Sequence, residues 1–133
     1  MALSLIGYIA AATAMALLDF AWLRMVTKPI YEPAIGAVLA EHTNVPAAVS
    51  FYVLYTLGIM VFATAPALRG GGWSTALAMG AAFGFFAYAT YDLTNMATLK
   101  VWPVHLAALD IAWGTVVTAI SATAGYAAGA RFG

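Results

Sequence analysis

Three aspartates, Asp19, Asp92 and Asp110, lie inside three long apolar segments of this chain. A carboxylate in hydrocarbon costs roughly 2.5 to 3.5 kcal/mol on insertion scales, so it normally faces the interior of a helix bundle. Three such acids in one small chain predict an internal acidic site that binds a ligand or couples helices. The residue types around them indicate which of these functions is favoured.

Aromatic side chains accompany all three acids. Asp19 and Asp110 both occur in the pattern Asp-x-Ala-Trp, and Asp92 follows Tyr91 directly. Residues three apart share a helix face, so each of the first two acids is predicted to project beside its own Trp. The same spacing places Tyr88, Tyr91, Asp92 and Asn95 on one face. Aromatic walls with a few convergent polar groups are typical of a small-molecule pocket, and rings and carboxylates both attract cations. The predicted ligand-binding residues are Asp19, Trp22, Tyr52, Tyr88, Tyr91, Asp92, Asn95, Lys100, Asp110 and Trp113.

A purely structural role for the acids is the alternative interpretation. An Asp inside a membrane bundle can accept a hydrogen bond from a Trp, Tyr or Asn on a neighbouring helix and fix the packing. Arg24, Lys28 and Lys100 have long side chains that can also reach down from the nearest membrane face to pair with the acids.

Composition limits the class of protein. The 133 residues are 65% hydrophobic and 8% charged, with zero net charge and a mean hydropathy of +0.93. Soluble domains carry about 25% charged residues, so lipid is the expected solvent. No basic block exists, which argues against a nucleic-acid partner. The absence of Cys excludes disulfides and thiolate chemistry. No metal site is predicted, because His105 lies five residues from Asp110 on a different helix face, and the sequence names no cofactor.

Four apolar segments predict an all-α integral membrane four-helix bundle in a single domain, residues 1–133. The expected spans are residues 3–25, 46–68, 74–99 and 103–129. Lys28-Pro29 is expected to end the first span, because proline stops helices, and residues 69–72 to form a flexible break. The N-terminal apolar stretch lacks a basic segment before it, so a retained helix is favoured over a signal peptide.

The connection between the first two spans is long for a helical hairpin, and such connections often contain structure of their own. Ile35, Val38 and Leu39 follow helical spacing. We therefore expect a short interfacial helix within residues 27–46, covering one end of the bundle. Gly80 and Gly84, and likewise Gly125 and Gly129, have the four-residue spacing that lets helices approach closely.

The three acids are predicted to share one depth. With four spans, the 27–46 connection and the 100–103 turn lie on the same side of the membrane. Asp19 and Asp92 precede that side by about six or seven residues, and Asp110 follows it by a similar number. At about 1.5 Å per residue, each lies roughly 10 Å inside a hydrocarbon core of about 30 Å. Tyr52 lies at a comparable level in the second span.

A distinctive stretch runs Tyr88-Ala-Thr-Tyr-Asp-Leu-Thr-Asn-Met-Ala-Thr-Leu-Lys-Val-Trp-Pro103. With Asp19-x-x-Trp22 before it and Asp110-x-x-Trp113-Gly114 after it, the chain resembles a family of small bacterial membrane proteins, domain of unknown function 2177. The resemblance covers essentially the whole chain. It implies a four-helix protein of the bacterial inner membrane and brings no activity with it.

Three functions remain open at this point. The favoured one is binding or transport of a small cation, solute or amphiphile, with membrane lipid around the chain and a homodimer as the unit that transport would need. The second is a non-catalytic accessory subunit of a larger membrane complex. The third is a lipid-modifying enzyme in which Asp92 or Asp110 acts as a general base while Lys100 or His105 orients a head group. An enzyme is less favoured, because no nucleophile–base pair is evident. Three basic residues on one side against two on the other leave the membrane orientation unresolved.

Overall fold

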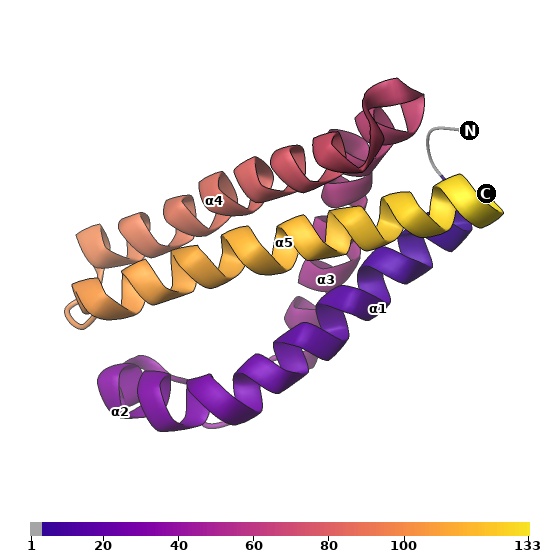
Figure 1. Cartoon of the computed structure of the whole chain (residues 1–133). Coiled ribbons are helices and arrows are strands. Elements are labelled where there is room, and N and C mark those ends of the chain that lie inside the picture. The colour runs from indigo at the N-terminus through magenta and orange to yellow at the C-terminus, as the bar shows by residue number, and fades with distance from the viewer. Residues whose placement is uncertain (1–3) are drawn as a thin grey trace.

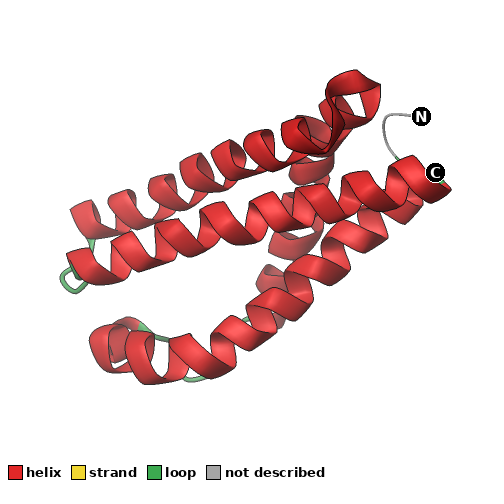
Figure 2. Ribbon diagram, viewed as in Figure 1, coloured by secondary structure: helices red, strands yellow, loops and turns green. Residues whose placement is uncertain are grey.

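The computed structural model describes residues 4–133, and within that range every regular element is a helix. Figure 2 shows the helices joined by short connections, without strands in the described chain. The long helices are α1 (Leu5–Trp22), α3 (Val45–Ile59), α4 (Gly72–Thr98) and α5 (Val104–Phe132). Shorter pieces extend or join them: η1 (Leu23–Tyr31), α2 (Glu32–Ile35), η2 (Gly36–Val38), η3 (Met60–Thr64) and η4 (Ala67–Gly71).

Side-chain caps fix where two of these helices begin. The Ser4 hydroxyl accepts the backbone N–H of Gly7 at 2.9 Å and starts α1. The Asn44 side chain accepts the N–H of Ala47 at 3.1 Å, so α3 begins at Val45, close to the predicted start. Such caps satisfy backbone donors that the first helical turn leaves without partners.

Three helical runs are long and apolar enough to cross a membrane: Leu5–Val38, Val45–Thr98 and Val104–Phe132. The predicted count of four spans is not supported, because the second and third predicted spans fall within one run of helical hydrogen bonds. The wide turns of η3 and η4 carry that run into α4. The predicted break at residues 69–72 is present as a kink inside the run, where Gly70 has a φ of 123° and Gly72 a φ of 77°. These left-handed values favour glycine, and the chain turns back on itself there (Figure 1).

The expectation that Lys28-Pro29 ends the first helix is wrong. The helix continues through Pro29 as the π-helical segment η1, in which the N–H of Glu32 bonds the carbonyl of Thr27. A π turn widens the helix by one residue, and this accommodates a proline that has no N–H to donate. The predicted interfacial helix therefore appears as α2 and η2, which extend the first helix rather than standing apart from it.

Figure 1 shows how the helices are arranged. α4 and α5 run side by side, whereas α1 meets α5 near the chain termini and diverges from it toward α2. The described ends of the chain and the turn between η4 and α4 lie at one end of the molecule. α2 and the α4–α5 connection lie at the other end.

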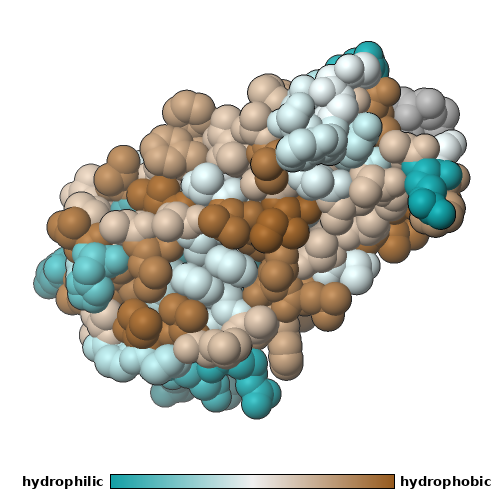
Figure 3. Space-filling view, viewed as in Figure 1, coloured by the Kyte–Doolittle hydropathy of each residue, from teal (hydrophilic) through white to brown (hydrophobic). Residues whose placement is uncertain are grey.

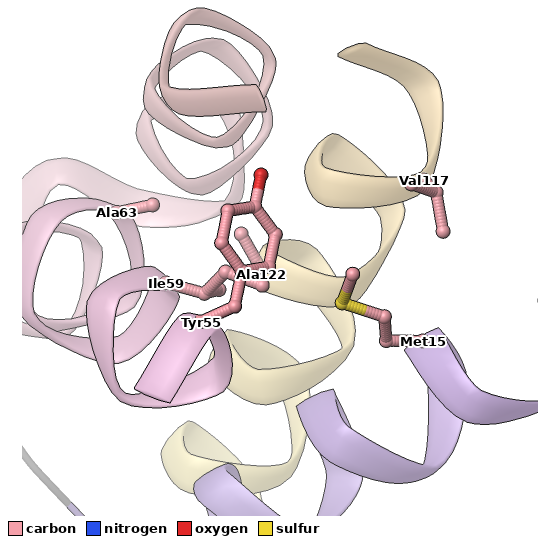
Figure 4. Packing of buried hydrophobic residues seen from close by; sticks show 6 residues of the cluster. All are labelled: Met15, Tyr55, Ile59, Ala63, Val117 and Ala122. Carbon is pink, nitrogen blue, oxygen red and sulfur yellow. The ribbon is translucent and has the colours of Figure 1, made fainter. Parts of the chain in front are cut away.

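The core is thin and the outer surface is apolar. One buried cluster joins α1, α3, η3 and α5, and Figure 4 shows its members: Met15, Tyr55, Ile59, Ala63, Val117 and Ala122. In contrast, Leu17 and Phe86 are each 67% exposed. Figure 3 shows strongly hydrophilic residues gathered at the two ends of the molecule, with apolar residues between them. A belt of exposed large apolar side chains is expected where lipid is the solvent.

Glycine sets the close packing of α4 against α5. A Cβ on Gly84 would lie 2.6 Å from the Thr118 hydroxyl and would collide with the Gly114 carbonyl. A Cβ on Gly80 would lie 2.8 Å from the Ala122 methyl group. On the α5 side, a Cβ on Gly114 would collide with the Tyr88 ring. The backbones therefore approach as closely as they do because these positions have no side chain.

We expect Gly84→Ala to destabilise the protein by about 1–3 kcal/mol, because the added methyl group forces α4 and α5 apart. Thermal unfolding in a mild neutral detergent measures the change. Gly36→Ala is the matched control, since nothing lies within 4 Å of the Cβ that it adds. Equal unfolding temperatures for the two variants would contradict glycine-limited packing.

Candidate functional site

Asp19 on α1 is bound by two other helices. Its Oδ2 accepts a hydrogen bond from the Tyr52 hydroxyl of α3 at 2.6 Å, and its Oδ1 accepts the indole N–H of Trp113 from α5 at 2.9 Å. Both donors are neutral. One carboxylate therefore joins three helices that are far apart in the sequence. Hydrogen bonds to a carboxylate are stronger than bonds between neutral groups, and a low dielectric strengthens them further.

The two Asp-x-Ala-Trp patterns interact across helices rather than within them. The sequence predicted that Asp110 would lie beside Trp113, but the Trp113 N–H points to Asp19 on α1. Trp22, the partner predicted for Asp19, instead stacks on Trp113 with ring centroids 4.4 Å apart and planes 6° from parallel. The repeat therefore forms an inter-helix pair of stacked indoles, in which Trp113 donates to Asp19 while Trp22 Nε1 has no hydrogen-bond partner within residues 4–133.

Asp110 receives its hydrogen bond from a residue that the sequence analysis did not include in the site. The Tyr31 hydroxyl, at the end of η1, donates to Asp110 Oδ1 at 2.8 Å. The Tyr31 ring also packs edge-on against Trp22, with centroids 6.2 Å apart. The continuation of the first helix through Pro29 is what brings Tyr31 here, so the error in predicting where that helix ends also hid this residue.

Asp92 is the most buried of the three acids, with 0% of its surface exposed. Its Oδ1 accepts the indole N–H of Trp102 at 3.1 Å, whereas its Oδ2 has no hydrogen-bond partner among the described residues. Its carboxyl group is a direct neighbour of the Asp110 carboxyl. Trp102 lies in the α4–α5 connection and points its N–H inward, to this buried acid.

Two adjoining cavities lie at this level. The smaller, about 210 Å³, is lined by Asp19, Trp22, Leu23, Thr27, Tyr31, Tyr52, Tyr88, Asp110 and Trp113. The larger, about 380 Å³, is lined by Phe51, Tyr55, Ala87, Tyr88, Tyr91 and Asp110. Tyr88 and Asp110 belong to both walls, so the cavities meet at these two side chains. Together the walls hold two carboxylates, and within residues 4–133 they include no Lys, Arg or His.

The structure brings seven of the ten predicted site residues to these walls: Asp19, Trp22, Tyr52, Tyr88, Tyr91, Asp110 and Trp113. The other three, Asp92, Asn95 and Lys100, do not line either cavity; Asp92 is buried behind Asp110, Asn95 is half-buried, and Lys100 is exposed.

Within residues 4–133, no Lys, Arg or His is hydrogen-bonded to these acids, so the pairing with basic side chains that the alternative interpretation allowed is not present there. Every hydrogen bond that the structure gives to the three carboxylates comes from a Tyr or a Trp. Arg24 places its guanidinium over the exposed Phe20 ring, 5.7 Å from the centroid. Within residues 4–133, no group of three or more His, Asp and Glu side chains is positioned to hold a metal ion.

Comparison with known proteins gives one match. A family model described as a predicted membrane protein, DUF2177, matches residues 4–127. No curated protein and no solved structure matches the chain.

We expect Asp19→Ala to destabilise the protein by about 1–3 kcal/mol, because two inter-helix hydrogen bonds are lost and two interior donors are left without an acceptor. Asp19→Asn retains one acceptor oxygen and should lose less. Unfolding in detergent measures both changes, and Glu41→Ala in the exposed connection is the control. An Asp19→Ala protein as stable as the wild type would show that these bonds contribute nothing to the fold.

Proposed function

Because the chain belongs to DUF2177, a family of predicted membrane proteins, we place its acidic site in lipid and propose that the site binds a lipophilic organic cation. The bound cation lies beside Asp110 and Asp19, against the aromatic rings of the two cavities. Its hydrocarbon part occupies the larger cavity.

The observation that carries this proposal is an acidic cavity without a basic side chain in its described walls. Two carboxylates surrounded only by neutral donors leave negative charge in a region of low dielectric, where charge without a counter-ion is costly. An organic cation supplies the missing charge. The stacked indoles of Trp22 and Trp113 and the phenol of Tyr88 offer ring faces and edges, and ring faces attract such a cation further.

The walls of the larger cavity favour a ligand that arrives from the lipid. Phe51 and Tyr91 are 42% and 55% exposed on the outer surface, and both line this cavity. Asp110 is its one carboxylate, and the other side chains of its wall are aromatic or Ala. A molecule with an apolar body and one positive charge matches this distribution. We limit the proposal to binding, because transport requires a site to open in turn to two sides of the membrane.

We further propose that the chain crosses the bacterial inner membrane four times. The run Val45–Thr98 has 54 residues, which as a straight helix would exceed a hydrocarbon core of about 30 Å more than twofold. The chain turns back at Gly70 (Figure 1), so α3 with η3 and α4 are each long enough for one crossing.

Four crossings predict which positions share a side of the membrane. The chain has no Cys, so a single introduced Cys is a unique label site. We expect a membrane-impermeant maleimide to label Glu41→Cys and Lys100→Cys from one side of the membrane. Arg69→Cys and Arg131→Cys should be labelled from the other side. Labelling of Arg69→Cys and Glu41→Cys from the same side would overturn the four-crossing arrangement.

Cation binding is tested by calorimetry on the protein in a neutral detergent. We expect hexyltrimethylammonium to bind, and its neutral analogue, with carbon in place of the nitrogen, to bind at least tenfold more weakly. Asp110→Asn should reduce the affinity for the cation by about tenfold or more, because a charge–charge contact in low dielectric is lost. The analogue should bind this variant and the wild type alike.

The controls separate charge from shape. Glu41→Gln removes an acid from the exposed connection and should leave binding unchanged. Equal affinities for the cation and its neutral analogue in the wild type would overturn the proposal.

Native mass spectrometry of the protein from its own membranes tests the accessory-subunit alternative. That alternative gains support if other polypeptides accompany the chain in place of a small molecule, and one or two chains with a bound cation support the proposal.

A further inference from the structure

The buried carboxyl of Asp92 is a group that the cation site does not use. It neighbours the Asp110 carboxyl, lines neither cavity and has none of its surface exposed. One of its oxygens accepts the Trp102 N–H, and the other, Oδ2, has no hydrogen-bond partner within residues 4–133. A buried polar atom without a partner is rare, and a proton on that oxygen would turn it into a donor.

The side chains near Asp92 determine whether its carboxyl group is more stable with a proton or without one. Its direct neighbours are Asp110 from α5 and Trp102 from the α4–α5 connection. Tyr31 of η1 and Tyr91 of its own helix are the other titratable groups nearby. None of these groups is basic, so none of them supplies a positive charge to an ionised Asp92. Two adjacent carboxyl groups in a low dielectric cannot both ionise cheaply. Tyr31 donates to Oδ1 of Asp110, which leaves the second oxygen of that carboxylate as an acceptor for Asp92.

We propose that Asp92 stores a proton that it shares with Asp110 and releases when a cation binds in the cavity. This inference rests on the proposed cation site. In the free protein, the Oδ2–H of Asp92 donates to the Asp110 carboxylate, so the pair carries one negative charge. The bound cation pairs with Asp110 and stabilises a second negative charge beside it.

The exchange is balanced in charge and in atoms. The O–H bond of Asp92 breaks, the proton passes through the Asp110 carboxylate to a buffer base in the water outside, and the two carboxylates remain with the cation. One positive charge leaves the pair as another arrives in the cavity. Binding thus becomes an exchange of a proton for an organic cation, and the two compete through a shared pair of acids.

Calorimetric titration of the wild type with hexyltrimethylammonium, in two buffers of different ionisation enthalpy at one pH, counts the protons. We expect about one proton released per cation bound and an affinity that rises by about tenfold per pH unit while Asp92 is protonated in the free protein. Asp92→Asn imitates the protonated acid, so it should still bind the cation, with no proton released and no dependence on pH.

The possible results distinguish the two proposals. Cation binding to the wild type without proton release, at a constant affinity across pH, would overturn the proton store and leave the cation site standing. Failure of the wild type to bind the cation would overturn both. Glu41→Gln is the matched control and should release the same proton as the wild type. Infrared spectroscopy of the wild type should show the carbonyl band of a protonated carboxyl group before the cation is added and its loss afterwards, a measurement that needs no variant.

Discussion

An aspartate inside hydrocarbon needs hydrogen-bond donors, and this need governs how these helices are arranged. Water supplies the donors at a soluble surface, but a lipid-embedded acid must obtain them from protein. Asp19 obtains them from α3 and α5, Asp110 from η1, and Asp92 from the α4–α5 connection. Each acid therefore links segments that apolar packing alone would hold only weakly, because lipid solvates apolar side chains as well as protein does.

Because the donors to these acids are neutral, the hydrogen bonds that stabilise the fold do not determine the charge of the site. A Lys or Arg partner would satisfy an acid and cancel its charge at once. Tyr and Trp satisfy the oxygens and add no positive charge, so the bonds that hold the helices together do not cancel the negative charge on which the proposed cation site depends. The two interpretations that the sequence left open, packing and ligand binding, are therefore compatible at Asp19 and Asp110, since each lines a cavity while it accepts a hydrogen bond from a neighbouring element.

The sequence predicted those features that depend on composition and spacing. Apolar length located the helical segments but not the number of separate runs, and the starts near Asn44 and Pro103 were correct. Spacing along the helices selected most of the residues that line the cavities. What depends on tertiary contact was missed. The pairing of Trp113 with Asp19 follows from the crossing of α1 and α5, which the spacing within one helix does not specify. Tyr31 was missed because Pro29 was expected to end the first helix. In the structure a π-helical turn accommodates Pro29 and the helix continues. The helix preference of proline alone does not predict this.

Phe51 and Tyr91 line the larger cavity and are also exposed, so the proposed cation site would exchange its contents with acyl chains rather than with water. A hydrocarbon tail that moves from bilayer to cavity gains little, because it leaves one apolar solvent for another. Tail length then governs how much of a compound accumulates in the membrane, and the head group governs how firmly the protein holds it. Preference among ligands would thus be decided over the few ångströms around Asp110, while the supply of ligand is decided by the bilayer itself.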